Sequence, residues 1–427
     1  MFSRFLRIFS QPYFGFVQGH DYLTKIELDS IEAEIGKSDR LLVERYESDF
    51  SKLIGDGFCT SYAAARMGFY ELMRVQGVGP GDEVILTGST CSVMATAVMR
   101  LGATTVYADI NPDDFGSCAV SIKQCISTRT KVIVAQHSFG IPCEITKIAE
   151  LASSLGIFLI EDCALAVGSS TDGKRVGNFG DAAIFSTDHS KPINTMSGGI
   201  VYTESMKLHE ELQKRSYTYP ELTVARQKSL WTRFLIERKF CNPRFQGWLE
   251  WIDAFYSILA LGGILKSPFL SDDFGTNFDC ANYGYPAKMP AFLCKLGSIE
   301  INRWPSVARS REYLLSQLIN VVTEPSSLIE LPKCYSDKSL QIVPLRLVWS
   351  SKSGHEIRAA WASKVRVNSI WFLTPIISTK EKLTEFGYKS GQCPISERLG
   401  QGMVNLPCNL KASFFSSLIE LARGLNK

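Results

Sequence analysis

The chain has 427 residues, of which 45% are hydrophobic and 21% are charged, and its formal net charge is +3. This is an ordinary globular composition with enough length for two domains, and its weak charge balance gives no support to a nucleic-acid partner. No run of roughly 18 apolar residues predicts a transmembrane segment. The 12 cysteines form no CxxC pair and no Cys/His cluster with metal-ligand spacing, which predicts reduced thiols in a cytoplasmic protein and no metal site.

The first 21 residues are expected to form an N-terminal segment. Residues 1–9 are basic and aromatic and contain no acid. They lack the apolar core length and the small-residue cleavage site of a signal peptide. Two interpretations stay open, a segment docked on the fold or a weak peripheral contact with a membrane surface or a partner.

Residues 22–203 alternate amphipathic helices with short apolar strands. Helices are expected at 22–35, 41–53, 62–75, 92–101 and 145–155, and strands at 83–87, 104–108, 131–135 and 158–161. Residues 55–61 are expected to form a turn. The alternation predicts an α/β fold whose mainly parallel sheet is flanked by helices on both faces.

After residue 203 the pattern changes to helices without strands. A polar helix is expected at 205–216, followed by an aromatic-rich helical insertion at about residues 217–275. Within the insertion, residues 230–265 are rich in Trp, Phe, Leu and Ile, with basic residues near the start. Three interpretations remain open for this segment, namely a subunit interface, a packed helical lid and a helix lying on a membrane surface.

From residue 282 the chain is expected to form a smaller α+β domain. A long helix begins at 290–303, further helices are expected at 354–364 and 411–425, and strands at 341–348 and 367–372. The predicted organisation is therefore an N-terminal segment (1–21), a large α/β domain (22–281) with its insertion, and a small domain (282–427).

Two polar side chains follow neighbouring apolar strands of the large domain. Asp162 ends the strand that begins at Phe158, and Lys191 lies in a polar turn after the next strand. Open α/β sheets bind ligands at the edge where such strands end. An amine and a carboxylate held apart by a flat ligand suit pyridoxal phosphate, since the amine forms an imine with its aldehyde and the carboxylate holds the pyridinium proton. Taken alone, the lysine could be a solvated surface residue and the aspartate a helix cap.

Several segments occur in an order that resembles a known family. They are residues 77–85, 90–97, 107–110, 130–133, 137–140, 160–162 and 180–186, and then Lys191 with Gly198 and Gly199. In this order the chain resembles the DegT/StrS-type sugar aminotransferases, pyridoxal phosphate enzymes with the aspartate aminotransferase-like fold (fold type I). The second domain matches only loosely, through residues 288–290 and 405–407.

The resemblance implies a role for three polar side chains near the cofactor. Lys191 would be the Schiff-base lysine and later the proton carrier. Asp162 would pair with the pyridinium nitrogen and keep it protonated. Ser186 would hydrogen-bond the phosphate.

Other positions carry over with departures from the family pattern. The backbone N–H groups of Ala65 and Arg66 would hold the phosphate, although small residues at a helix start also suit close helix packing. Cys91 falls where the family usually has an aromatic ring that stacks on the cofactor, and Leu165 replaces a common glutamine. The candidate substrate-binding residues are His189, Lys288 and Asn282.

The resemblance implies transfer of the amino group of glutamate to a keto-sugar carried on a nucleotide. The product would serve cell-surface polysaccharide, such as lipopolysaccharide, or secondary metabolism, and the enzyme would be a cytoplasmic homodimer. Two alternatives stay open, a pyridoxal phosphate enzyme with another outcome (a dehydratase or a non-nucleotide keto substrate) and a non-catalytic regulatory relative. Some relatives that dehydrate carry His at the lysine position, so Lys191 favours amino transfer.

Overall fold

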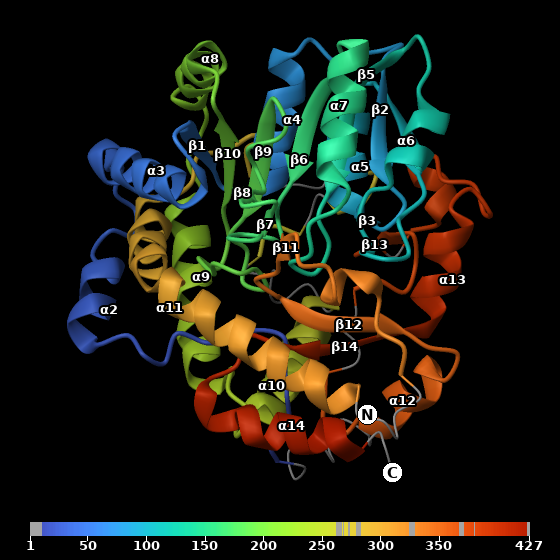
Figure 1. The fold of residues 1–427 in the computed structure, drawn as a ribbon. Coiled ribbons are helices and arrows are strands. Elements are labelled where there is room, and N and C mark those ends of the chain that lie inside the picture. The colour runs from blue at the N-terminus through green and yellow to red at the C-terminus, as the bar shows by residue number, and fades with distance from the viewer. Residues whose placement is uncertain are drawn as a thin grey trace.

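The computed structural model describes residues 11–261, 267, 269–271, 274–278, 283–323, 329–366, 371–379 and 381–424. A seven-stranded sheet with the order β1-β10-β9-β6-β5-β2-β4 forms its centre (Figure 1). The strands are β1 (Phe58–Tyr62), β2 (Glu83–Thr87), β4 (Thr104–Ala108), β5 (Thr130–Gln136), β6 (Phe158–Asp162), β9 (Ala182–Ser186) and β10 (Gly199–Thr203). All neighbours from β9 to β4 pair in parallel, and β10 is antiparallel to both β9 and β1. The predicted mainly parallel sheet is confirmed.

Helices cover both faces of this sheet because its strands bury side chains on both sides. Val84 and Leu86 belong to one apolar core with α4, whereas Ile85 between them packs in another core with α6 and α7. The helices of this part are α2 (Lys25–Glu32), α3 (Arg40–Ile54), α4 (Ala65–Val75), α5 (Ser92–Met99), α6 (Ala119–Cys125), α7 (Ile145–Leu155) and α8 (Met206–Ser216).

The aromatic-rich insertion contains two helices, α9 (Val224–Phe240) and α10 (Gln246–Leu261). Residues 241–245 separate them and include Pro243, which cannot donate the backbone hydrogen bond of a helix interior. Within the described part of the chain, no helix combines the length and the apolar character needed to span a bilayer.

The C-terminal part has an apolar core of its own. The long helix α11 (Ala291–Val322) leads into it, and strands β12 (Arg346–Ser350) and β14 (Met403–Pro407) form an antiparallel pair there. Its other helices are η2 (Lys333–Tyr335), α12 (Gly354–Trp361), η4 (Leu383–Phe386), α13 (Pro394–Gly402), η5 (Ala412–Phe414) and α14 (Phe415–Arg423). Phe14 and Phe16 of the N-terminal segment also pack in this core, which ties that segment to the C-terminal part.

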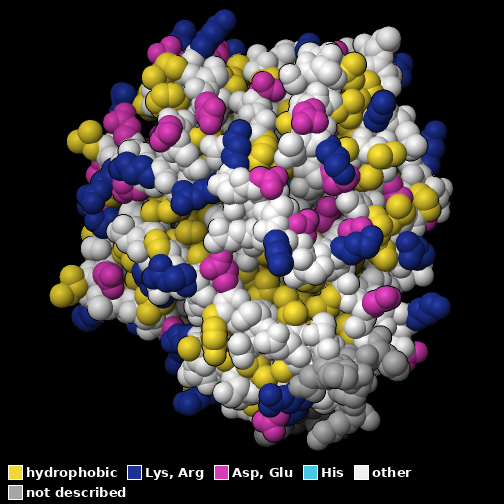
Figure 2. All heavy atoms as spheres, viewed as in Figure 1, with side chains coloured by type: hydrophobic (Ala, Val, Ile, Leu, Met, Phe, Trp, Pro, Cys, Tyr) yellow, Lys and Arg dark blue, Asp and Glu magenta, His cyan; other side chains and the backbone are white. Residues whose placement is uncertain are grey.

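Short strands join the two parts of the molecule. β3 (Thr90–Cys91) pairs with β13 (Ile376–Ile377), and β7 (Ser170–Thr171) pairs with both β8 (Lys174–Arg175) and β11 (Leu340–Gln341). On the face shown in Figure 2, blue and magenta side chains are intermixed, as the small net charge leads one to expect.

Several predicted element boundaries were wrong. Residues 58–61 were expected to form a turn but belong to β1, so α4 begins at Ala65 rather than at residue 62. The strand expected at 341–348 is divided between β11 and β12, and α6 was not predicted. The strand expected at 367–372 falls mostly outside the described residues, as do residues 1–10 and Asn282.

Candidate active site

A cavity of about 550 Å³ lies at the edge of the sheet where β5, β6 and β9 end. This is the edge at which open α/β sheets bind ligands, and the volume suits a small-molecule site. Seven of the nine candidate residues line the cavity, namely Ala65, Arg66, Cys91, Asp162, Ser186, His189 and Lys191.

Asp162 is the last residue of β6, and its side chain is 7% exposed. Its Oδ1 accepts a hydrogen bond from the Ala164 N–H at 3.0 Å. Burial raises the pKa of this carboxyl above its ordinary value, while the Ala164 N–H and the charge of Lys191 act in the opposite direction. A cation or a protonated ring nitrogen beside Asp162 would therefore be stabilised by the carboxylate and would stabilise it in turn.

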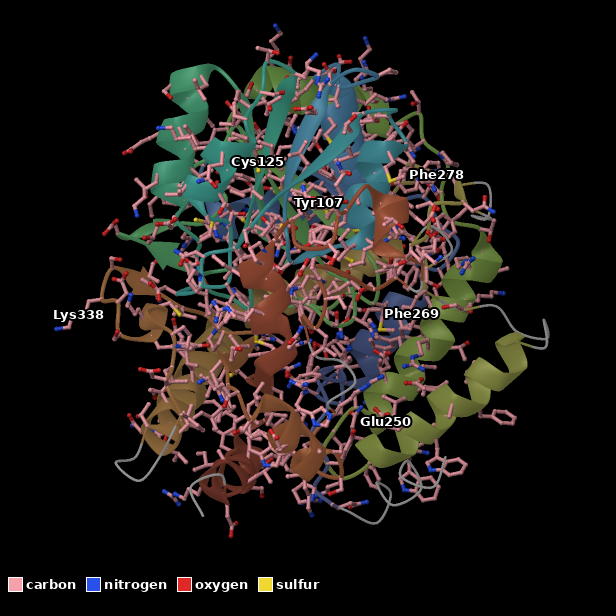
Figure 3. All side chains as sticks on the ribbon, turned by 90° about the vertical axis from the view of Figure 1, so that its right-hand side faces the viewer. Tyr107, Cys125, Glu250, Phe269, Phe278 and Lys338 are labelled. Atoms are coloured by element: carbon pink, nitrogen blue, oxygen red, sulfur yellow. The ribbon has the colours of Figure 1, made fainter. Side chains whose placement is uncertain are left out.

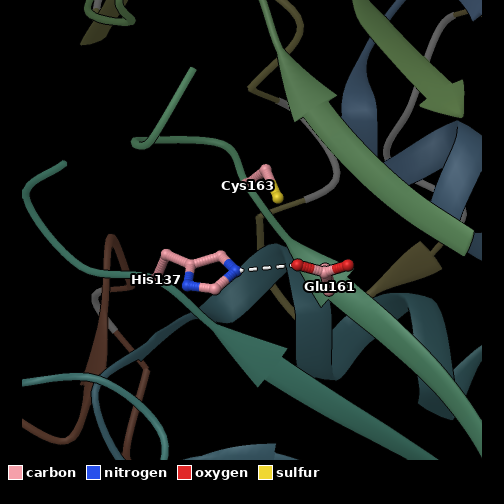
Figure 4. Close-up of side chains that lie close together, drawn as sticks. All are labelled: His137, Glu161 and Cys163. Carbon is pink, nitrogen blue, oxygen red and sulfur yellow. Dashed lines mark hydrogen bonds and ion pairs between the residues drawn. The ribbon is translucent and has the colours of Figure 1, made fainter. Parts of the chain in front are cut away.

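A buried polar cluster lies at the end of β6, next to Asp162 in the chain; Figure 4 shows its members His137 and Glu161, with Cys163 nearby. The His137 N–H donates to the Asp162 carbonyl at 3.1 Å. His137 Nδ1 accepts from the Cys143 N–H at 3.1 Å, so Nε2 carries the proton and donates to Glu161 Oε2 at 3.2 Å. The same carboxylate accepts backbone N–H groups at 2.6–2.8 Å from Gly177, Phe179 and Gly180. Cys163 lies near this pair, but the ligand atoms of His137 and Glu161 are engaged in hydrogen bonds that fix the end of β6.

Lys191 lies in the loop between β9 and β10, and its side chain is half-buried. Its N–H donates to the Asp188 carbonyl at 2.9 Å, and its Nζ lies 5.4 Å from the centre of the Trp371 ring. No carboxylate in the described ranges forms an ion pair with Nζ. The amine and the Asp162 carboxylate therefore face one cavity without contacting each other.

The N-terminus of α4 forms another wall of the cavity. Ala64 precedes the helix in an extended conformation, and no side chain caps the helix. A Cβ at Gly199 would collide with the backbone of Ala65, so the glycine lets this helix start lie directly against β10. An uncapped helix N-terminus that borders a cavity favours an anion through its N–H groups and its dipole. Ser186, at the end of β9, places a hydroxyl on the same cavity.

The remaining predicted residues differ in their placement. Cys91, at the end of β3, lines the cavity and pairs with Ile377 across the joining strands. Lys288 does not line the cavity, and its N–H donates to the Pro220 carbonyl at 3.0 Å. Asn282 lies outside the described residues, so its role stays a prediction.

Sequence reasoning missed several residues that the fold brings to the cavity. Arg346, Arg366 and Trp371 come from the C-terminal part, and Phe269 and Phe274 come from the insertion. The Arg66 side chain donates to the Leu270 carbonyl, which ties the start of α4 to the insertion. No local motif marks these positions, because they reach the cavity only through packing between distant segments.

The model of the DegT/DnrJ/EryC1/StrS aminotransferase family matches residues 34–236. GDP-perosamine synthase of Escherichia coli O157:H7 is 33% identical over 168 residues, which are 39% of this chain and 46% of that protein. UDP-N-acetyl-3-dehydro-alpha-D-glucosamine 3-aminotransferase of Acidithiobacillus ferrooxidans is 33% identical over 187 residues, which are 44% of this chain and 50% of that protein. The matched segment thus spans about half the length of these relatives.

Solved structures of aminotransferases share the fold over almost the whole chain. TlmJ of Streptoalloteichus hindustanus superposes with a TM-score of 0.67 at 20% identity, covering 96% of this chain and 97% of that one. An aminotransferase of Streptococcus pneumoniae, solved in its PLP form, gives a TM-score of 0.67 at 17% identity over 95% of this chain and 96% of that one. The fold is therefore that of the fold-type I aminotransferases, and residues 34–236 are similar to the DegT/DnrJ/EryC1/StrS aminotransferase family.

Proposed function

We propose that this chain is a pyridoxal phosphate-dependent aminotransferase that moves the amino group of glutamate onto a nucleotide-linked keto-sugar. The observation that carries the proposal is the pair of groups facing one cavity, the Lys191 amine and the Asp162 carboxylate. The named activities of the relatives, GDP-perosamine synthase and a UDP-linked 3-aminotransferase, support the substrate class.

The chemistry of the cavity wall fits pyridoxal phosphate. Asp162 would hold the ring nitrogen, Lys191 the aldehyde, and the start of α4 together with Ser186 the phosphate. Each of these groups has the charge or the hydrogen-bonding capacity that its part of the cofactor requires. Cys91 offers a polarisable sulfur where the family usually has a stacking ring.

In the proposed reaction, the cofactor supplies an aldehyde that exchanges amino groups and a ring that withdraws electrons. Asp162 would keep the proton on the ring nitrogen, which would strengthen that withdrawal. Lys191 would act as the base that takes a proton from Cα of the amino donor and as the acid that returns it on the cofactor side. In the second half-reaction the same amine would work in the opposite direction on the keto-sugar.

We place the protein in the cytoplasm, where the nucleotide-linked sugars that it would use are made. The support is that every described cysteine is a free thiol, most of them buried, as is usual in a reducing compartment.

We also propose a homodimer in which the exposed apolar face of the insertion contacts the partner subunit. The exposed large apolar side chains of this region include Leu235, Phe245, Trp248 and Phe255. Exposed apolar side chains of this size favour burial against a partner.

The cofactor assignment is tested by absorption spectroscopy of the purified protein with pyridoxal phosphate, before and after glutamate is added. We expect the visible band of a lysine-bound cofactor and its loss upon addition of glutamate. Lys191→Ala should abolish that band and turnover, whereas Lys207→Ala, on the exposed surface of α8, should retain both. A wild-type protein that binds no pyridoxal phosphate would overturn the proposal.

A further inference from the structure

The side of the cavity that faces the C-terminal part is rich in cationic groups. Arg346 of β12 and Arg366, after α12, both line the cavity. Arg346 is 6% exposed; its Nη1 donates to Asn405 Oδ1 at 3.2 Å, and its guanidinium lies 4.1 Å from the centre of the Phe16 ring. Burial and the charge of Arg366 lower the pKa of Arg346 to about 9. The Arg366 side chain is 23% exposed, and two guanidinium groups that lie close together, one of them buried, are stabilised by an anion between them or beside them.

One of these arginines is held by the insertion. Glu250 lies on α10, is 5% exposed, and forms an ion pair with Arg366 at 2.9 Å between Oε1 and Nε. Figure 3 shows Glu250 on α10 and Phe269 close to α9, toward the right of the view. Since this carboxylate is almost completely buried, its position fixes the arginine against the cavity.

A second carboxylate of the insertion holds a histidine of the lysine loop. Glu237 of α9 is fully buried, and its Oε1 lies 3.0 Å from His189 Nδ1 and 2.8 Å from Arg233 Nε. Arg233 also forms an ion pair with Asp253 of α10. The His189 ring packs 4.2 Å from the ring of Phe269, centre to centre.

This network favours the charged form of His189. Burial alone lowers the pKa of the imidazole, but the carboxylates of Glu237 and Asp188 outweigh both burial and the nearby Arg233, so that the pKa is raised. Burial raises the pKa of Glu237, whereas His189 and Arg233 bring it down to about 2. Nδ1 is engaged by Glu237, whereas Nε2 lies 3.8 Å from Asp188 Oδ1, which is beyond hydrogen-bond distance, so Nε2 can still donate to a ligand in the cavity.

We propose that the α9–α10 insertion builds an anion-binding subsite in the active-site cavity. Glu250 positions Arg366 and Glu237 positions His189. Together with Arg346, these two cations bind a phosphate or carboxylate group of the substrate. The proposal rests on the proposed function and specifies how the same cavity recognises its substrate. Glu237 and Glu250 are positioning residues, since they act through the cations that they hold. His189 and Arg233 lie in the segment that the family model matches, whereas the other residues of the subsite follow that segment in the chain.

The subsite is tested by calorimetric titration of the purified full-length protein, without turnover. GDP and UDP serve as diphosphate probes and 2-oxoglutarate as the dicarboxylate probe. We expect Glu250→Gln, Glu237→Gln and Arg366→Gln each to weaken one class of probe by about tenfold or more, because a misplaced cation loses a charge-assisted hydrogen bond. The class that is weakened identifies the substrate group, either the diphosphate of a nucleotide or the carboxylate of the amino donor.

The matched control is Glu150→Gln, the same chemical change on the exposed surface of α7, which should leave both affinities unchanged. Pyridoxal phosphate affinity, followed by absorbance, should stay unchanged in all the variants, whereas general damage to the fold would lower it together with probe binding. Unaltered affinity for all three probes in Arg366→Gln and Glu250→Gln would overturn the subsite. That result would leave the spectroscopic test of Lys191 unaffected, so the two proposals fail separately. Should Glu237→Gln not fold, Arg366→Gln decides the question by itself.

Discussion

Asp162 is a buried acid whose carboxylate has a backbone N–H on one side and the cavity on the other. Its carboxylate accepts one backbone N–H and faces the cavity, and its pKa is raised by burial. A buried acid of this kind is most stable as a carboxylate when a positive group stands beside it. This arrangement suits an acid that must hold a proton on a ring nitrogen of a bound cofactor.

Asp162→Asn is therefore expected to lower turnover by about a hundredfold or more, since a neutral amide cannot stabilise the protonated ring. Steady-state kinetics with glutamate and a keto-sugar nucleotide measure the effect, and absorbance shows whether the cofactor is retained. Asp172→Asn, in the exposed turn between β7 and β8, is the control and should keep full activity. Turnover within twofold of wild type in Asp162→Asn would contradict the assigned role.

Glu47 gives the protein a pH-dependent stability that is unrelated to catalysis. The side chain lies buried on α3 and accepts hydrogen bonds from Ser61 N and Oγ, both at 2.6 Å. Burial raises its pKa to about 7, while the Ser61 hydrogen bonds act in the opposite direction. The folded state thus binds a proton more tightly than the unfolded chain does, so this group makes the free energy of unfolding fall as the pH rises from about 5 to 7.

Replacing Glu47 by Gln should remove most of this decrease in the free energy of unfolding, because the amide oxygen keeps the Ser61 hydrogen bonds without a charge. The variant should therefore recover up to about 3 kcal/mol of the free energy of unfolding at pH 7. Urea unfolding at pH 5, 6 and 7 measures the difference, with Glu150→Gln as the control. Parallel pH profiles for wild type and Glu47→Gln would show that the carboxyl titrates normally.

At the scale of elements, the start of α4 and strand β10 depend on each other. Gly199 opens β10 and permits the backbone of Ala65 to lie against it, which places the helix N-terminus on the cavity. The helix start can therefore serve as an anion site only while this position has no side chain.

Gly199→Ala should destabilise the fold by about 1–3 kcal/mol through overpacking and weaken pyridoxal phosphate binding. Thermal unfolding and cofactor titration measure the two effects. Gly79→Ala, where an added Cβ meets open space, is the matched control and should change neither. If Gly199→Ala bound pyridoxal phosphate as tightly as the wild type does, the start of α4 would not be needed for phosphate binding.

At the scale of the whole molecule, the insertion has two sides with different chemistry. Its inner side supplies the buried carboxylates Glu237 and Glu250, whereas its outer side exposes Trp248 (48%) and Phe255 (60%). The basic side chains of Lys239 and Arg244 are exposed on the same two helices or between them. An apolar outer side suits a subunit contact, and a combination of aromatic and basic residues also suits a membrane surface.

The double variant Trp248→Glu with Phe255→Glu should convert a dimer into monomers, since two charges would be buried in the contact. Sedimentation velocity measures this, and Leu155→Glu, on the exposed side of α7, is the control. A wild-type monomer, or a dimer that persists in the double variant, would exclude this face as the subunit interface. Co-sedimentation of wild type with anionic lipid vesicles would identify the membrane alternative.

The parallel sheet and the location of Asp162 and Lys191 at one edge of it could be predicted from the sequence because the signals for both are local. Continuous apolar runs such as 131–135 and 158–161 can bury both faces only inside a sheet; Asp162 follows such a run directly, and Lys191 lies in the loop after the next strand. The β1 strand was missed because Gly55, Asp56 and Gly57 before it dominated the local turn signal.

The sequence by itself determined the class of fold and the placement of an amine and a carboxylate at one edge of a sheet, since alternation of helix and strand leaves few topologies. Only the tertiary structure decided what surrounds that pair. Arg346, Arg366 and Glu250 are distant in sequence from Lys191 and carry no periodic pattern that reports their partners. Their convergence depends on how α10, β12 and the loop after β9 pack, and packing between distant segments is information that no local stretch of sequence contains.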